Sequence, residues 1–137
     1  NFQGFTEDQS ASLIGLGSTA ISNFPQAIIQ NEKNAGRYGM IVSQDRLPGT
    51  LGVRRGPDDQ RRGAIIEALL CHGKAQVGAG WLAELHGRLA PFIDRQLARI
   101  DGDWLVLNEG ALPYARSIAA QFDAYRQDSM RRFSSAV

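Results

Sequence analysis

The chain has 137 residues, 43% of them hydrophobic, and a formal net charge of +1. This length fits one domain with a sizeable core and perhaps a piece of a second, and the near-neutral charge argues against a strongly electrostatic nucleic-acid binder. The single cysteine, Cys71, cannot form an internal disulfide or by itself make a metal site, a usage typical of a reducing cytoplasmic protein.

No apolar run approaches the length of a membrane span, and no signal peptide is evident. The chain begins with Asn1 instead of methionine, so we interpret it as a piece of a longer protein. It contains neither internal repeats nor low-complexity runs.

The opening stretch, residues 1–21, carries the strongest functional signal. In an extended segment Phe2 and Gln3 point to opposite faces, so one can enter a site while the other packs. Residues 13–21 then set bulky apolar side chains among glycines, which suits a backbone that comes close to a ligand and adopts positive φ angles.

The spacing of Gly15, Gly17 and Ala20 also resembles the dinucleotide fingerprint. That motif needs a preceding strand and a following helix, and Pro25 would remove a backbone donor from such a helix. The context therefore disfavours a dinucleotide site.

Residues 23–57 are expected to connect two larger parts. Residues 27–30 form a short apolar element, and Asn31 is predicted to cap a helix that extends to about Ser43. Residues 47–49 mark a break and residues 50–54 a short extended segment.

A longer helix is predicted to begin at Pro57, which tolerates the first turn and is followed by two acidic residues. Its apolar face consists of Ile65, Ile66, Leu69 and Leu70. Asp58 and Arg62 lie four residues apart and could form a surface ion pair. At its end, a buried Cys71 thiol and a surface or capping His72 are favoured over a nucleophile and its base.

The helical stripe continues through Trp81, Leu82, Leu85 and Leu89 until Pro91, which is predicted to start or kink a helix reaching Leu97. Asp101-Gly102 between two apolar runs predicts a hairpin, with strands at residues 97–100 and 104–107. Asn108 could cap the final helix, whose buried stripe would contain Ile118, Ala119, Phe122 and Tyr125.

These elements predict a mainly α fold with a small β-hairpin, of the α+β class. The order helix, helix, hairpin, helix favours a winged-helix-like bundle from residue 58 onward. The part before it would be an appendage.

Several short segments stand out in order along nearly the whole chain: Asn1-Phe2-Gln3-Gly4, residues 13–21, residues 30–34, Tyr38, Asp58-Asp59, Leu70-Cys71, residues 116–118, residues 122–125 and Phe133-Ser134. Together they resemble the carboxyl-terminal portion of oxygen-independent coproporphyrinogen III oxidase, of the radical S-adenosylmethionine type. The resemblance implies that residues 1–22 are a remnant of an α/β barrel edge, residues 23–57 a connecting segment, and residues 58–137 a helical, winged-helix-like domain.

The resemblance also implies an activity for the longer protein, the oxidative decarboxylation of two propionates of coproporphyrinogen III to vinyl groups. In that family a four-iron, four-sulfur cluster on a C-x-x-x-C-x-x-C loop cleaves S-adenosylmethionine to a radical that removes a hydrogen from the propionate. The cluster motif is absent from this chain, so we expect no metal ligands, no catalytic residues and no activity of the chain alone.

By the same resemblance, Phe2 and Gln3 match the end of a barrel strand near S-adenosylmethionine, and Ile21 matches a residue that contacts it. Phe2 and Ile21 would pack on the adenine or ribose, and Gln3 would exchange hydrogen bonds. The alternative for Phe2 and Ile21 is core at a domain interface. The helical domain would cover the barrel mouth and exclude water.

This chain departs from the family pattern at basic positions. Leu51 stands where an arginine is expected, Gly63 replaces a second arginine after Arg62, and Ala111-Leu112 replaces a Gly-Arg pair. Arg54, Arg55, Arg61 and Arg62 are therefore only candidates for a substrate-carboxylate role.

Two other functions stay open: a sibling of the family that binds and delivers haem, and a winged-helix nucleic-acid-binding module. The missing upstream sequence would distinguish the haem-delivering sibling from the oxidase. Salt-dependent binding to duplex DNA would support the nucleic-acid-binding module. We favour the oxidase, a cytoplasmic protein expected to be a monomer, with S-adenosylmethionine and coproporphyrinogen III as partners and neither nucleic acid nor membrane.

Overall fold

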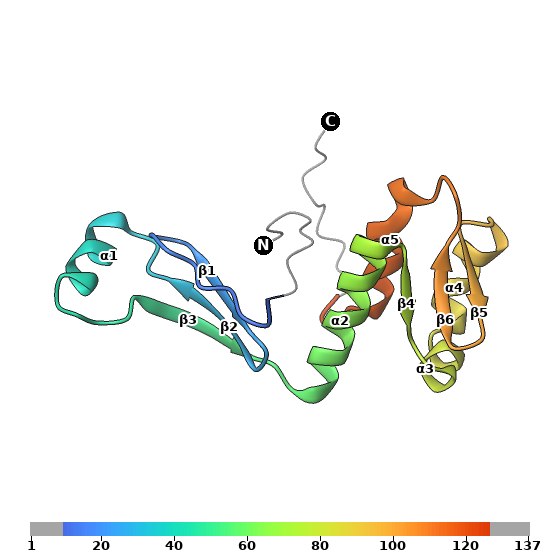
Figure 1. Cartoon of the computed structure of the whole chain (residues 1–137), viewed down its shortest axis with the longest axis horizontal. Coiled ribbons are helices and arrows are strands. Elements are labelled where there is room, and N and C mark those ends of the chain that lie inside the picture. The colour runs from blue at the N-terminus through green and yellow to red at the C-terminus, as the bar shows by residue number, and fades with distance from the viewer. Residues whose placement is uncertain (1–9, 127–137) are drawn as a thin grey trace. The chain divides into compact units, whose positions relative to one another are not determined.

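The computed structural model describes residues 10–126 (Figure 1). It has a mixed α+β fold whose described residues divide into two compact units: an N-terminal unit, residues 10–61, and a C-terminal unit, residues 62–126. Within the described residues, every helix is too short or too polar to cross a membrane.

The N-terminal unit is built on a three-stranded antiparallel sheet in the order β1-β2-β3. Its strands are β1 (Ile21–Phe24), β2 (Ala27–Asn31) and β3 (Gly49–Arg54). The extended segment predicted over residues 50–54 is confirmed as β3, and the apolar element at residues 27–30 is a strand. The domain boundary expected after residue 22 falls inside β1.

Helix α1 (Ala35–Val42) connects β2 to β3. The prediction that Asn31 caps it is wrong. Asn34 is the N-cap, and its side-chain oxygen accepts a hydrogen bond of 3.0 Å from the backbone amide of Arg37. Asn31 ends β2, where its side chain is buried.

The C-terminal unit combines helices with a second three-stranded antiparallel sheet, in the order β4-β6-β5. In chain order its elements are α2 (Pro57–His72, which begins in the N-terminal unit), β4 (Lys74–Gln76), α3 (Ala79–Glu84), α4 (His86–Asp94), β5 (Ala98–Asp101), β6 (Trp104–Leu107), η1 (Leu112–Tyr114), α5 (Ala115–Ala119) and η2 (Ala120–Phe122). The helix start at Pro57 is confirmed.

One hydrophobic core joins the elements of this unit. Its largest fully buried side chains are those of Phe122, Leu69, Leu89, Leu105, Ile118 and Val77. The predicted α2 stripe is confirmed, with Ile65 and Leu69 buried and Ile66 and Leu70 packed against the core. The Asp101-Gly102 hairpin is also confirmed, because β5 pairs with β6 and Gly102 adopts a φ of +57°.

Three local predictions in this unit are wrong. The helix predicted to reach Leu97 ends at Asp94, and the break between α3 and α4 falls at Leu85. Pro91 lies inside α4 and therefore does not start a helix, and the alternative of a kink at Pro91 stays a prediction. Asn108 caps no helix: its amide donates to the carbonyl of Gln96 and accepts from Arg99, which joins the two ends of the hairpin. Tyr125 is 74% exposed because the helical segments end at Phe122.

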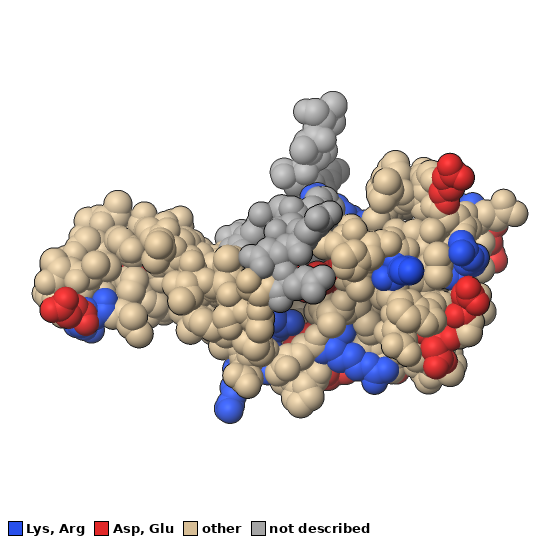
Figure 2. Space-filling view, in the orientation of Figure 1, with Lys and Arg blue, Asp and Glu red and all other residues tan. Residues whose placement is uncertain are grey.

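The faces of the two units that are visible in Figure 2 differ in their charged side chains. Figure 2 shows acidic and basic side chains intermingled on the visible face of the C-terminal unit, whereas the visible face of the N-terminal unit is mostly uncharged. The few charges on the visible face of the N-terminal unit agree with the exposed apolar residues of the β1-β2-β3 sheet, which include Ile28, Leu51 and Val53.

Candidate cofactor-binding site

The glycine-rich loop, residues 13–20, runs beside β1. Leu13 and Asn23 form an isolated antiparallel bridge, with N···O distances of 2.8 and 2.9 Å. A Cβ atom on Gly15 would lie 2.7 Å from the carbonyl oxygen of Ile21, so the two backbones approach as only glycine allows. Gly17 has a φ of +103°. In the structure these glycines therefore serve backbone packing and turning.

Polar side chains, among them the buried Asn31 and Ser22, hold this loop in place. The Asn31 amide donates to the carbonyl oxygens of Gly15 and Gly17, each at 3.0 Å. The backbone amide of Gly15 donates to the Ser22 hydroxyl at 3.1 Å, and that of Gly17 donates to the Tyr38 hydroxyl at 3.1 Å. The loop conformation is thus set by side chains of β1, β2 and α1.

Sequence reasoning missed this role for Ser22 and Asn31. Both are buried, at 7% and 6% exposure, on strands whose other members are largely apolar or exposed. A buried polar side chain usually has a hydrogen-bond partner. A polar residue at an inward strand position is therefore the signal that could have identified both.

Replacing Asn31 by alanine should loosen the loop. The substitution removes two hydrogen bonds and leaves the carbonyls of Gly15 and Gly17 without their donor. We expect a loss of about 1–3 kcal/mol in the free energy of unfolding, measured by thermal unfolding, with faster hydrogen exchange at residues 13–20.

The matched control is Gln30→Ala, because the Gln30 amide also donates to the loop, at the carbonyl of Thr19 and at 3.1 Å, but in an exposed position. Its effect should be smaller, since water can replace an exposed donor. Equal losses for the two variants would contradict a clamping role for Asn31.

Ile21 begins β1 and is half-buried. Directly paired residues of an antiparallel sheet share a face, so Ile21 lies on the same face as Gln30 and Leu51. Residues two apart along a strand also share a face, so the next row, Asn23, Ile28 and Val53, belongs to the same face. We call this the Ile21 face. Ile28, Leu51 and Val53 are 38%, 57% and 59% exposed, so within the described residues this face exposes apolar side chains beside the polar Asn23 and Gln30.

The other two predicted site residues, Phe2 and Gln3, lie outside the described residues. Leu51 stands where the resemblance predicts an arginine. It pairs with Gln30, which in turn pairs with Ile21, so Leu51 and Ile21 lie in line across the sheet. This position therefore adds apolar area to the Ile21 face instead of a positive charge.

Two of the candidate arginines make contacts that stabilise the fold. Arg62 lies over the Trp81 ring, 4.6 Å from its centroid, and donates to the carbonyl of Phe122 at 3.3 Å. Arg55 donates to the side-chain oxygen of Asn23 at 3.3 Å and to the carbonyl of Asp59 at 3.5 Å. The Asp58–Arg62 ion pair stays a prediction.

The described residues do not fit an iron–sulfur cluster. Among residues 10–126, no three His, Cys, Asp or Glu side chains are grouped so as to hold a metal ion. Cys71 is exposed, contrary to the expectation of a buried thiol, because it lies two residues beyond Leu69 and therefore off the buried face of α2. The described part of the chain supplies no ligand set for such a cluster.

No protein-family model matches the chain, but comparisons with known proteins find similar sequences. The oxygen-independent coproporphyrinogen III oxidase of Bradyrhizobium diazoefficiens is 35% identical over 148 aligned residues, which cover all of this chain and 32% of the relative. The chain is homologous to these oxidases. A Cereibacter sphaeroides relative described as anaerobic coproporphyrinogen III oxidase 1 is 31% identical over 96% of this chain and 31% of its own length.

A solved structure of coproporphyrinogen III oxidase from Escherichia coli, described as a radical SAM enzyme, agrees with the fold. Its TM-score is 0.79 at 26% identity, over 92% of this chain and 31% of that one. The chain thus spans about a third of the length of the oxidases that it matches.

Proposed function

We propose that this chain is the carboxyl-terminal part of an oxygen-independent coproporphyrinogen III oxidase, which converts coproporphyrinogen III to protoporphyrinogen IX by oxidative decarboxylation. The supporting observation is the match over the whole chain to relatives with that name. The E. coli structure of similar fold, described as a radical SAM enzyme, adds the reaction type.

In this proposal, S-adenosylmethionine and a four-iron, four-sulfur cluster supply the radical chemistry when bound to the longer protein. The cluster ligands would come from outside the described residues, in which no three His, Cys, Asp or Glu side chains are grouped so as to hold a metal ion. We therefore expect the 137-residue chain alone to be inactive. The longer protein would be a cytoplasmic monomer that binds coproporphyrinogen III and S-adenosylmethionine.

The contribution of this chain would be one wall of the cofactor site. Ile21, with Phe2 and Gln3, would contact S-adenosylmethionine. The apolar character of the Ile21 face suits packing on an adenine or ribose, and the loop beside it is held by the Asn31 and Ser22 hydrogen bonds. A loop that is held by such hydrogen bonds needs little reorganisation when a ligand binds beside it.

Residues 58–137 would form a winged-helix-like domain that covers the barrel mouth and excludes water, and residues 1–22 an edge of the barrel. The order α2, β4, α3, α4, β5, β6, with the sheet order β4-β6-β5, supports the winged-helix comparison. We do not assign it to DNA binding, because α4, the second helix of the α3–α4 pair, carries a single Arg88 and no lysine.

The decisive experiment uses the longer protein. Its upstream sequence should contain the C-x-x-x-C-x-x-C loop, and the purified, reduced protein should convert coproporphyrinogen III under anaerobic conditions in the presence of S-adenosylmethionine. An upstream sequence without three such cysteines would refute the enzyme class. Haem binding without any turnover would assign the protein to the haem-delivering sibling.

Ile21→Asp tests the cofactor wall in the same protein. A carboxylate against an apolar ligand surface carries a desolvation penalty of about 1–3 kcal/mol, so the Kd for S-adenosylmethionine should rise roughly tenfold or more. Calorimetric titration under anaerobic conditions measures this value.

The matched control is Leu47→Asp, which adds the same charge to the same unit at a residue that is 93% exposed and lies outside the Ile21 face. Leu47→Asp should leave the Kd within about twofold of the unmodified protein, because a surface substitution has a small effect. If Ile21→Asp binds S-adenosylmethionine as tightly as Leu47→Asp does, Ile21 does not contact the cofactor.

A further inference from the structure

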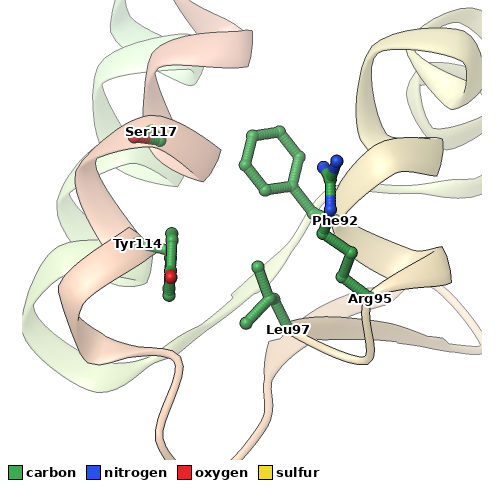
Figure 3. Close-up of a pocket in the computed structure, with 5 residues that line it drawn as sticks. All are labelled: Phe92, Arg95, Leu97, Tyr114 and Ser117. Carbon is green, nitrogen blue, oxygen red and sulfur yellow. The ribbon is translucent and has the colours of Figure 1, made fainter.

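A pocket of about 540 Å³ opens in the C-terminal unit, away from the glycine-rich loop in sequence (Figure 3). It is lined by Phe92, Arg95, Leu97, Tyr114 and Ser117, which come from α4, the turn after it, η1 and α5. Its volume is within the range of about 300–1,000 Å³ that is usual for small-molecule sites. Neither the proposed activity nor the cofactor wall uses it.

The apolar side of the pocket is fixed to the core. Phe92 and Leu97 are half-buried and pack against the buried cluster, so their positions are set by folding. Tyr114 is 48% exposed, and Figure 3 shows Phe92, Leu97 and Tyr114 in the space between α4 and the η1–α5 segment. This side can accept a flat or branched apolar group.

The polar side carries one positive charge and two hydroxyls. Arg95 is exposed, and among residues 10–126 its guanidinium makes one hydrogen bond, of 3.3 Å from Nη1 to the carbonyl of Pro91. A guanidinium has five N–H donors, so most of them remain for a ligand. Asp94 is the adjacent residue but does not line the pocket. Tyr114 and Ser117 add hydroxyls that can donate to an anion.

We propose that this pocket binds a small carboxylate with an aromatic or branched apolar body. The carboxylate would accept hydrogen bonds from Arg95, in the geometry that a planar guanidinium favours, and the apolar body would lie against Phe92, Leu97 and Tyr114. None of the five lining residues belongs to the proposed cofactor wall, and the proposal does not depend on the enzyme assignment.

The test titrates the uniformly ¹⁵N-labelled full chain with two probes of similar shape, 1-naphthoate and the neutral 1-naphthylmethanol, and follows backbone amide shifts. Naphthoate should shift the amides of the lining residues saturably and bind more tightly than the alcohol. Arg95→Gln should weaken naphthoate binding about tenfold, as expected for loss of a charge-assisted hydrogen bond, and should leave binding of the alcohol unchanged.

Arg88→Gln is the matched control, because Arg88 is an exposed arginine of α4 that does not line the pocket. It should bind naphthoate as the unmodified chain does. The proposal is overturned if naphthoate shifts amides elsewhere, if no saturable shift occurs, or if Arg95→Gln and Arg88→Gln bind naphthoate equally. The spectrum of each variant without probe reports whether its fold is intact.

Discussion

Phe122→Ala is expected to destabilise the C-terminal unit by about 3–5 kcal/mol, because removing a buried aromatic ring loses the free energy of burying its apolar surface and leaves a cavity. Phe122 is fully buried in the core with Leu69, Leu89 and Ile118. Natural domains are stable by only about 5–15 kcal/mol, so much of the unit's stability should be lost. Urea denaturation followed by tryptophan fluorescence measures the effect.

This probe reports on the unit alone, because both tryptophans of the chain, Trp81 and Trp104, belong to it. The control is Tyr125→Ala, since Tyr125 is 74% exposed and should change stability by no more than about 0.5 kcal/mol. A midpoint for Phe122→Ala that equals that of Tyr125→Ala would show that Phe122 does not lie in the core.

Gly15→Ala should have the largest effect in the N-terminal unit. The added Cβ would lie 2.7 Å from the carbonyl oxygen of Ile21 and 2.8 Å from its carbonyl carbon and amide nitrogen. Backbone atoms cannot rotate away as a flexible side chain can, so the loop must move off β1. We expect a loss of about 1–3 kcal/mol, the usual range for overpacking, measured by thermal unfolding.

The movement should also break the hydrogen bonds that Gly15 makes with Ser22 and Asn31. Hydrogen exchange should therefore increase in residues 13–20. Gly39→Ala is the control: a Cβ there meets nothing within 4 Å, and the position is inside α1. Alanine should stabilise that helix by about 0.5–1 kcal/mol. The same sign for both variants would contradict a steric origin of the Gly15 effect.

Some elements could be predicted because their signals are local. The turn at Asp101-Gly102 needs a residue that adopts positive φ between two apolar runs, and Gly102 does so. The start of α2 depends on Pro57 and the acidic residues after it, which act within the first turn. Its buried stripe follows from the helical period alone.

Other assignments failed because they depend on partners that are distant in the chain. Asn31 is a good cap by residue type, but its amide reaches the carbonyls of Gly15 and Gly17 instead. Asn108 likewise joins Gln96 and Arg99. An asparagine satisfies its amide equally well in a cap, a turn or a clamp, so its type does not determine its role.

The order of the residues by itself indicated the resemblance to these oxidases, the hairpin and the apolar stripe of α2, because collinear motifs, turn residues and periodicity are properties of neighbouring positions. Only the tertiary structure decided that Ile21 shares a face with Leu51 and Val53, and that Arg62 lies over Trp81. Strand register and contacts between separate elements depend on which surfaces pack together. The packing that forms is the one that lowers the free energy of the whole unit, and no single segment determines it.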